Sequence, residues 1–238
     1  MTLKSKHSRM CWGTMVKTWR HISIASIFVV SLALDGCASE RKVPPRVERG
    51  TLDLTDWDFE RDGVVPLKGE WLFWWNDFVK PEHFTLDALR PSPDGLFRVP
   101  GIWTETDNPL GDVAPLPRVG HATFVLNVVL PRRDANSALL ALYQRWVFSA
   151  SRFILVDGAD VVEVLDHGVV ARDPALEIPH PLPSVGSLPL KGRHITLVWY
   201  VSNSHHARAG PLFNPILGLD TELKQKLLYE RLRSIGLT

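Results

Sequence analysis

The chain has 238 residues and a formal net charge of +1, which excludes a protein that binds nucleic acid through a strongly basic surface. Apolar residues make up 45% of the chain and charged residues 22%, a composition typical of a globular protein and not of a disordered one. The two cysteines, Cys11 and Cys37, are too few for a disulfide framework or a cysteine-ligated zinc site.

An export signal is predicted at the N-terminus. Residues 1–36 hold five of the 27 basic residues of the chain and only one of its 26 acidic residues. The apolar run "ISIASIFVVSLAL" (Ile22–Leu34) is 13 residues long, whereas a membrane-spanning helix needs about 20 residues. Residues 1–36 therefore have the basic start and short apolar core of a signal peptide.

The residues after the apolar run indicate a lipoprotein. Leu34 and Gly36 precede Cys37 in the order found in the lipobox of bacterial lipoproteins. Lipidation of Cys37 would anchor the chain in a membrane of the cell envelope, facing the periplasm. The alternatives are an ordinary export signal with a chance cysteine and a cytoplasmic protein. The charged, proline-containing residues 37–50 are predicted to be a tether.

Strand patterns dominate the chain from residue 51 onward. In "EWLFWWN" (residues 70–76) both sets of alternating positions are apolar, which predicts a strand buried on both faces. "PEHFTLDAL" (81–89) predicts one short helix with Pro81 near its start. Residues 122–131 and 137–144 predict two further strands.

The second half of this region contains a hairpin and a long strand. Two β-branched runs within residues 151–165 flank Asp157 and Gly158, a pair that favours the positive φ angles of a type I′ turn. Residues 172–192 are rich in proline and predict a surface connection, and residues 193–202 predict a long strand. Many short strands separated by turns indicate an all-β fold, an antiparallel sandwich or barrel covering residues 51–218.

Residues 219–238 are predicted to form a C-terminal amphipathic helix, with Thr221 as a possible cap. Two interpretations stay open: a helix packed on the sandwich, or a connector to a partner or to a following segment. The stripe of apolar residues comprises Leu223, Leu227, Leu228, Leu232 and Ile235.

Five segments occur in an order that resembles a known family. They are "LKGEWLFWWNDF" (67–78), "VPGIW" (99–103), "GHATFVLNVVLP" (120–131), "FILVDG" (153–158) and "LVWYVSNSHHARAGPLFNPILG" (197–218). Together they resemble the periplasmic N-terminal sensor region of bacterial seven-transmembrane receptors with diverse intracellular signalling modules.

The resemblance implies a galactose-binding-like jelly-roll β-sandwich that senses a ligand and feeds a membrane signalling protein. In those receptors seven membrane helices follow this region. Two alternatives therefore stay open: a stand-alone lipoprotein version of the sensor, or the front piece of an interrupted receptor gene.

The loop "VSNSHHARAGP" (Val201–Pro211) concentrates polar side chains after a predicted strand. Adjacent histidines point to opposite sides of an extended chain and therefore do not chelate one ion well, and the helical H-E-x-x-H spacing is absent. His121 or Asp166 could supply a third ligand, but nothing in the sequence requires it. Ser202 and Ser204 lie near a histidine, but the chain has no G-x-S-x-G elbow for a nucleophile. The remaining interpretations are a ligand-binding rim and a structural loop.

The predicted ligand-binding residues are those whose side chains offer hydrogen bonds or an aromatic face: Trp103, Trp199, Asn203, His205, His206 and Arg208. Trp71, Trp75 and Trp146 are assigned to the core instead. The acidic residues between Asp53 and Asp62 are expected to form a solvated charged stretch, and not the carboxylate pair of a glycosidase.

The sequence thus favours a non-catalytic periplasmic sensor domain without a cofactor or metal. Its expected ligand is small and polar or carbohydrate-like, and its expected contacts are the membrane, through lipidated Cys37, and a membrane signalling protein. The alternatives are an envelope lipoprotein that acts as a structural or interaction module and, third, a carbohydrate-active hydrolase.

Overall fold

The computed structural model describes residues 42–85, 88–134 and 137–236, so the predicted signal peptide and Cys37 lie outside the described residues. The chain divides into two units, Met1–Lys42 and Val43–Thr238, and the fold below is that of the second unit. Within the described residues, no helix combines the length and the apolar character that crossing a bilayer requires.

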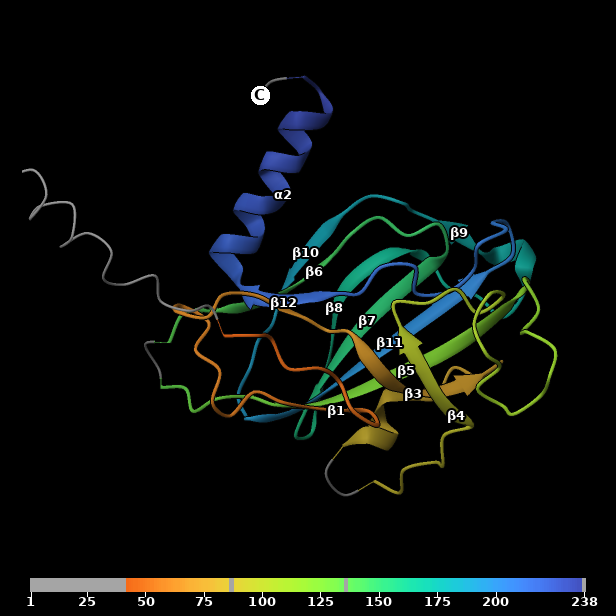
Figure 1. Cartoon of the computed structure of the whole chain (residues 1–238), viewed down its shortest axis with the longest axis horizontal. Helices are drawn as coiled ribbons and strands as arrows, with labels where there is room; N and C mark the ends of the chain where they lie inside the picture. The colour runs from red at the N-terminus through yellow and green to blue at the C-terminus, as the bar shows by residue number, and fades with distance from the viewer. Residues whose placement is uncertain (1–41, 86–87, 135–136, 237–238) are drawn as a thin grey trace, which may run out of the picture. The chain divides into compact units, whose positions relative to one another are not determined.

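The second unit is a β-sandwich of two sheets with a C-terminal helix, which confirms the predicted fold class (Figure 1). The large sheet has the order β4-β3-β5-β11-β7-β8-β9, with β1 paired in parallel to β5, and the small sheet has the order β10-β6-β12-β2. All other strand pairs are antiparallel. The strands are β1 (Thr51–Asp53), β2 (Val65–Pro66), β3 (Gly69–Trp75), β4 (Gly95–Val99), β5 (Gly120–Val129), β6 (Leu140–Gln144), β7 (Ala150–Asp157), β8 (Asp160–Val169), β9 (Ile178–Pro179), β10 (Ser184–Ser187), β11 (His194–Asn203) and β12 (Ile216–Leu219).

The main core lies between the inner faces of the two sheets and is rich in aromatic rings. Trp199 of β11 stacks on Phe153 of β7 at a centroid distance of 4.6 Å, and Trp71 of β3 meets Trp199 edge-on at 5.9 Å. Leu142 of β6 and Leu217 of β12 belong to the same buried cluster from the small sheet. Alternating apolar residues of both sheets therefore form one continuous core.

A second apolar cluster covers the outer face of the large sheet. Trp74, Val125 and Val198 point away from the main core and pack with Phe84. Phe84 ends the short 3₁₀ helix η1 (Pro81–Phe84), which occupies the start of the helix predicted over residues 81–89. The central strands are buried on both sides for this reason, as the doubly apolar pattern of residues 70–76 predicts.

The C-terminal helix α2 (Asp220–Ser234) packs on the outer face of the small sheet. Leu223 is fully buried there against Ala141 and Tyr143, whereas Leu228 is 58% exposed and Ile235 is 68% exposed. The five apolar residues therefore do not form one buried stripe, because only the side of α2 that carries Leu223 and Leu227 faces the sheet.

The helix also begins differently from the predicted start. The residue preceding it is Leu219, which makes no side-chain cap, and Thr221 is exposed in the first turn. Asp220 holds the first turn instead: its carboxylate accepts the Ser187 hydroxyl at 2.5 Å and pairs with Lys224 at 2.8 Å. A carboxylate at this end of a helix is favoured by the helix dipole.

Three boundaries predicted from sequence are corrected by the backbone. The fold begins before residue 51, since Val47 of the predicted tether is 2% exposed and bridges to Gly69. The β7–β8 turn consists of Gly158 and Ala159, and the single positive φ, 64° at Gly158, matches a type II′ turn instead of type I′. The predicted connection over residues 172–192 contains β9 and β10, because the edges of both sheets offer unpaired backbone groups there.

One buried histidine lies where β8 approaches β10. His167 is 1% exposed, and its Nε2 lies 2.8 Å from the Ser184 hydroxyl. Burial of the ring, reinforced by the positive charge of nearby His180, lowers the pKa of His167 to about 4 against the opposing effect of Asp166. The ring is therefore held neutral at physiological pH.

Replacing Trp199 by Ala is expected to lower the free energy of unfolding by about 3–5 kcal/mol, because the substitution empties a site in the densest part of the core. Leu228→Ala is the control, since Leu228 is 58% exposed and surface substitutions change stability by about 0.5 kcal/mol or less. Urea unfolding measures both. A Trp199→Ala protein as stable as the control would contradict this placement of the ring.

The stability of the protein is expected to fall as the pH is lowered from 6.5 to about 4, since His167 has a pKa of about 4 in the fold and 6.5 when unfolded. The unfolded state binds the extra proton in this window, which costs the fold ~3 kcal/mol at the acid end. Urea unfolding at pH 7 and pH 5.5 measures the onset. His167→Gln should flatten the profile relative to the control His194→Gln, an exposed histidine; equal profiles for both variants would refute the assignment.

Candidate ligand-binding site

The loop 201–211 is held by a buried asparagine. Asn203, the last residue of β11, is 1% exposed. Its side-chain nitrogen donates to the carbonyls of Arg118 (3.0 Å) and His206 (2.8 Å). Its oxygen lies within acceptor distance of the Ser149 hydroxyl (3.2 Å) and the His206 N–H (3.3 Å). Asn203 is thus committed to internal bonds and offers little to a ligand.

The two histidines of this loop differ in environment. His205 is exposed, whereas the ring of His206 stacks on Phe148 at a centroid distance of 3.9 Å, and its Nδ1 accepts the N–H of Arg208 at 3.0 Å. Arg208 Nε lies 3.6 Å from a Glu105 oxygen, with both side chains 56% exposed. Within the described residues, no group of three or more His, Cys, Asp or Glu side chains is placed to hold a metal.

The predicted role of the two tryptophans is corrected by the structure. Trp103 and Trp199 are both fully buried, and the ring of Trp103 lies against Trp75 at 5.1 Å in the core. Neither indole presents a face to a ligand at this surface. Asn203, His206 and Arg208 do come together in the loop, but their contacts build the loop itself.

A polar cavity lies at the end of the long strands that is opposite to the 201–211 loop. Its volume is about 790 Å³, and it is open to solvent. β11 spans ten residues, so the cavity and the 201–211 loop are roughly 30 Å apart along the strand. The cavity is lined by residues 55–61, which follow β1, and by residues 131–133, 137–138, Arg193 and Leu219.

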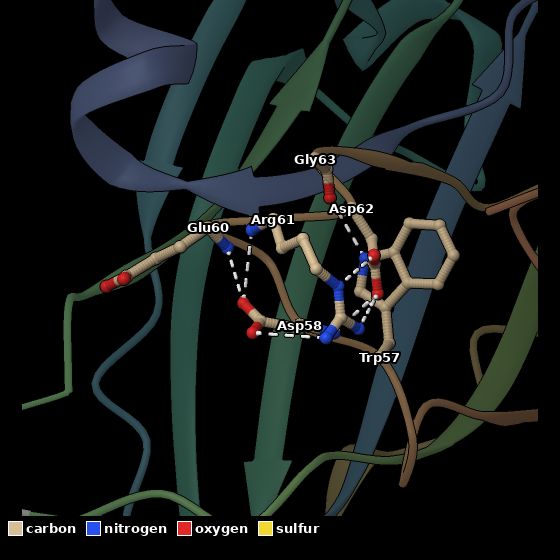
Figure 2. Close-up of polar contacts among 6 residues, drawn as sticks. All are labelled: Trp57, Asp58, Glu60, Arg61, Asp62 and Gly63. Carbon is tan, nitrogen blue, oxygen red and sulfur yellow. Dashed lines mark hydrogen bonds and ion pairs between the residues drawn. The ribbon is translucent and has the colours of Figure 1, made fainter. Parts of the chain in front are cut away.

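The first wall is a tightly closed turn (Figure 2). One oxygen of Asp58 accepts the backbone N–H groups of Glu60 (3.0 Å) and Arg61 (3.2 Å). The Arg61 guanidinium donates to both oxygens of Asp62 at 2.7 and 2.8 Å, and this pairing raises its pKa. The Trp57 indole N–H donates to the Gly63 carbonyl at 2.9 Å.

The acidic side chains from Asp53 to Glu60 are exposed, as predicted, but Asp62 and the aromatic residues of this turn are not. Trp57 and Phe59 are 3% and 5% exposed and belong to the main core, and the side chain of Asp62 is 5% exposed. From Trp57 to Glu60 aromatic and acidic residues alternate, and the two aromatic side chains lie inside. This alternation is the sequence signal that would have identified an ordered wall.

The second wall carries arginines from the ends of two paired strands. Arg132 and Arg133 follow β5, and Arg193 precedes β11. These arginines were not predicted from the sequence, because Arg193 lies 60 residues after Arg133 in the chain. The signal was available in the antiparallel pairing of two long predicted strands, which brings the end of one to the start of the other.

The cavity adjoins the base of α2. Leu219, the last residue of β12, lines it, and the next residue begins the helix. The N–H of Asp220 donates to the carbonyl of Leu139 at 2.9 Å, and Leu139 follows the cavity residue Ala138. One strand end therefore contributes to both the cavity and the helix.

No protein-family model and no curated protein matches this chain. Solved structures with partial similarity include a beta-glucuronidase from Faecalibacterium prausnitzii (TM-score 0.44, 13% identity, 65% of this chain and 31% of that chain). A second is a GH2 beta-galacturonidase from Eisenbergiella tayi bound to galacturonate (TM-score 0.38, 13% identity, 65% of this chain and 24% of that chain). A third is a beta-glucosidase from Kluyveromyces marxianus in complex with glucose (TM-score 0.32, 14% identity, 75% of this chain and 19% of that chain). The chain spans less than a third of each, and similarity this limited carries no argument about its function.

Asn203→Ala is expected to lower the free energy of unfolding by about 2 kcal/mol, because the substitution leaves buried donors and acceptors of the loop without partners. His205→Ala, in the same loop but exposed, should change stability by about 0.5 kcal/mol or less. Urea unfolding compares the two. Equal stability of both variants would restore the view that Asn203 is available to a ligand.

Proposed function

We propose that this chain is a non-catalytic ligand-binding domain of the bacterial cell envelope that takes a small polar or carbohydrate-like ligand and feeds a membrane signalling protein. The observation that carries this proposal is the polar cavity whose wall runs directly into α2. The resemblance of the sequence to receptor sensor regions and the lipobox at Cys37 favour the same role.

The size and lining of the cavity suit such a ligand. Its volume of about 790 Å³ falls in the usual range of small-molecule sites, about 300–1,000 Å³. The lining provides acceptors on Asp56 and Glu60, hydroxyls on Thr55 and Ser137, and the donors of the arginines. A molecule with several hydroxyl groups needs this mixture of donors and acceptors.

The contacts of the acidic wall support binding without catalysis. A glycosidase needs two carboxyl groups, about 5–5.5 Å or about 6.5–9.5 Å apart, that are available to the substrate. The Asp58 carboxylate already accepts two backbone N–H groups, and both Asp62 oxygens accept from Arg61. These carboxylates build the turn, so they are poor candidates for an acid and a nucleophile.

The proposed signal is a shift of α2 when the cavity is filled. Asp220 connects the helix to Leu139, and farther along α2 the Tyr143 hydroxyl donates to Glu230 at 2.6 Å. The Tyr143–Glu230 hydrogen bond couples the helix to β6, and within α2 Lys226 pairs with the same Glu230 at 2.8 Å. A ligand that changes the position of residues 137–139 would act on the first turn of α2, and differential affinity for two helix positions would produce the response.

A thermal-shift screen with neutral sugars and small carboxylates tests the site. A probe at 100 times its dissociation constant should stabilise the protein by about 2.7 kcal/mol. Ala138→Trp should abolish the shift by filling the cavity. Ala207→Trp in the 201–211 loop is the matched control, because both alanines are exposed, and it should leave the shift unchanged.

The other outcomes identify the alternatives. Loss of the shift in Ala207→Trp but not in Ala138→Trp would move the site to the loop. No shift with any probe would favour an envelope interaction module. Release of product from generic glycosides would establish a hydrolase and refute binding without catalysis.

A further inference from the structure

We propose that the ligand carries an oxyanion, such as a carboxylate, that is bound by Arg132, Arg133 and Arg193, while its hydroxyl groups face the acidic wall. This inference rests on the proposed function, because it specifies the class of ligand for the same cavity.

The antiparallel pairing of β5 and β11 places the arginines at one corner of the large sheet. Val129 is paired with His194, so the residues that follow β5 lie beside the residue that precedes β11. The Leu130 N–H donates to the Arg193 carbonyl at 2.8 Å, and Arg193 Nε donates to the Leu130 carbonyl at 3.1 Å. These two bonds fix Arg193 against the chain that leads to Arg132 and Arg133.

The guanidinium groups of Arg133 and Arg193 are each held by a backbone carbonyl, and neither group is saturated with partners. Arg193 uses one N–H on the Leu130 carbonyl, and Arg133 uses one nitrogen on the Ala138 carbonyl. A guanidinium has five N–H donors. In the described part of the chain, Arg132, Arg133 and Arg193 form no ion pair within 4.0 Å, so most of their donors stay available to a ligand in the cavity.

The nearby acidic groups do not remove the need for an anion at this corner. Asp134 acts on Arg133 through space, and Asp53 and Arg193 act on each other in the same way. Burial lowers the pKa of Arg133, which means that its charge is incompletely compensated in the fold. Like charges at one corner repel each other, and an oxyanion relieves that repulsion.

The choice of arginine favours a planar or multidentate oxyanion. A guanidinium binds a carboxylate or a phosphate through two parallel hydrogen bonds, which a lysine ammonium does not do. The lining segment 55–61 carries the carboxylates of Asp56 and Glu60, which can accept hydrogen bonds from hydroxyl groups and repel an anion. The division of charge between the walls therefore orients a hydroxyl-rich acid with its anionic end toward the arginines.

Titration calorimetry on the protein at low salt tests the inference with matched probes. Glucose and glucuronate, or galactose and galacturonate, differ only in the group at C6. At least one uronate should bind about 10-fold more tightly than its neutral partner, which corresponds to about 1.4 kcal/mol. Inorganic phosphate is the third probe: tight binding of phosphate without the uronates would identify a phosphoryl group as the source of the oxyanion.

Arg132→Gln is the variant to compare, because no side-chain hydrogen bond or ion pair of Arg132 stabilises the described fold. It should reduce the preference for the uronate to less than about 3-fold while leaving any binding of the neutral sugar intact. Arg208→Gln, at the other end of the sheet, is the matched control and should keep the full preference.

The experiment distinguishes a failure of the oxyanion inference from a failure of the proposed function. Neutral sugars that bind as tightly as the anionic probes would overturn the oxyanion inference and leave the proposed function standing. A preference for the uronate that survives Arg132→Gln, Arg133→Gln and Arg193→Gln in separate variants would also overturn it. Absence of binding by every neutral and anionic probe would count against the proposed function and this inference together.

Discussion

The pairing of β5 with β11 is the constraint on which the rest of the structure depends. Their register runs without interruption from Val129 opposite His194 to Gly120 opposite Asn203. Within it, Phe124 and Trp199 face the main core, while Val125 and Val198 face the outer cluster. A slip of one residue would exchange the two faces, and it would replace a bulky aromatic core by aliphatic residues shaped for the other side. The register therefore fixes both the core and the positions of the loops at the two ends of the sheet.

The same pairing explains how much could be predicted from sequence. The long strands β3, β5 and β11 are seven to ten residues long and largely apolar on both faces, and these apolar runs are sufficient to identify them. β2 and β12 have only two and four residues, and tertiary pairing decides their conformation. The strand pattern around Trp199 predicts that its ring is buried on one face of the sheet. The pattern does not predict whether the ring also reaches a ligand-binding surface.

The candidate site was harder to predict because it is assembled from distant segments. The polar residues of the 201–211 loop are contiguous in sequence, which favours a prediction of a binding site there. Contiguous polar groups can also form hydrogen bonds with each other, as the Asn203 side chain does with the backbone of His206. The cavity combines residues 55–61 with Arg133 and Arg193, which no local pattern connects. The two ends of the sandwich thus differ in a physical sense. At one end the polar groups bond mainly to each other, and at the other Arg133 and Arg193 each donate from one side-chain nitrogen to a backbone carbonyl.

The attachment of α2 gives the cavity a route to the rest of the molecule. The first turn of the helix is bonded to both strands that flank it, through Leu139 and Ser187. The side that carries Leu223 is buried, while Leu228 and Ile235 on the opposite side are exposed. The main contacts of α2 are with β6, β10 and β12 of the small sheet, and under the proposed function a ligand that moves residues 137–139 would act on the first turn of the helix.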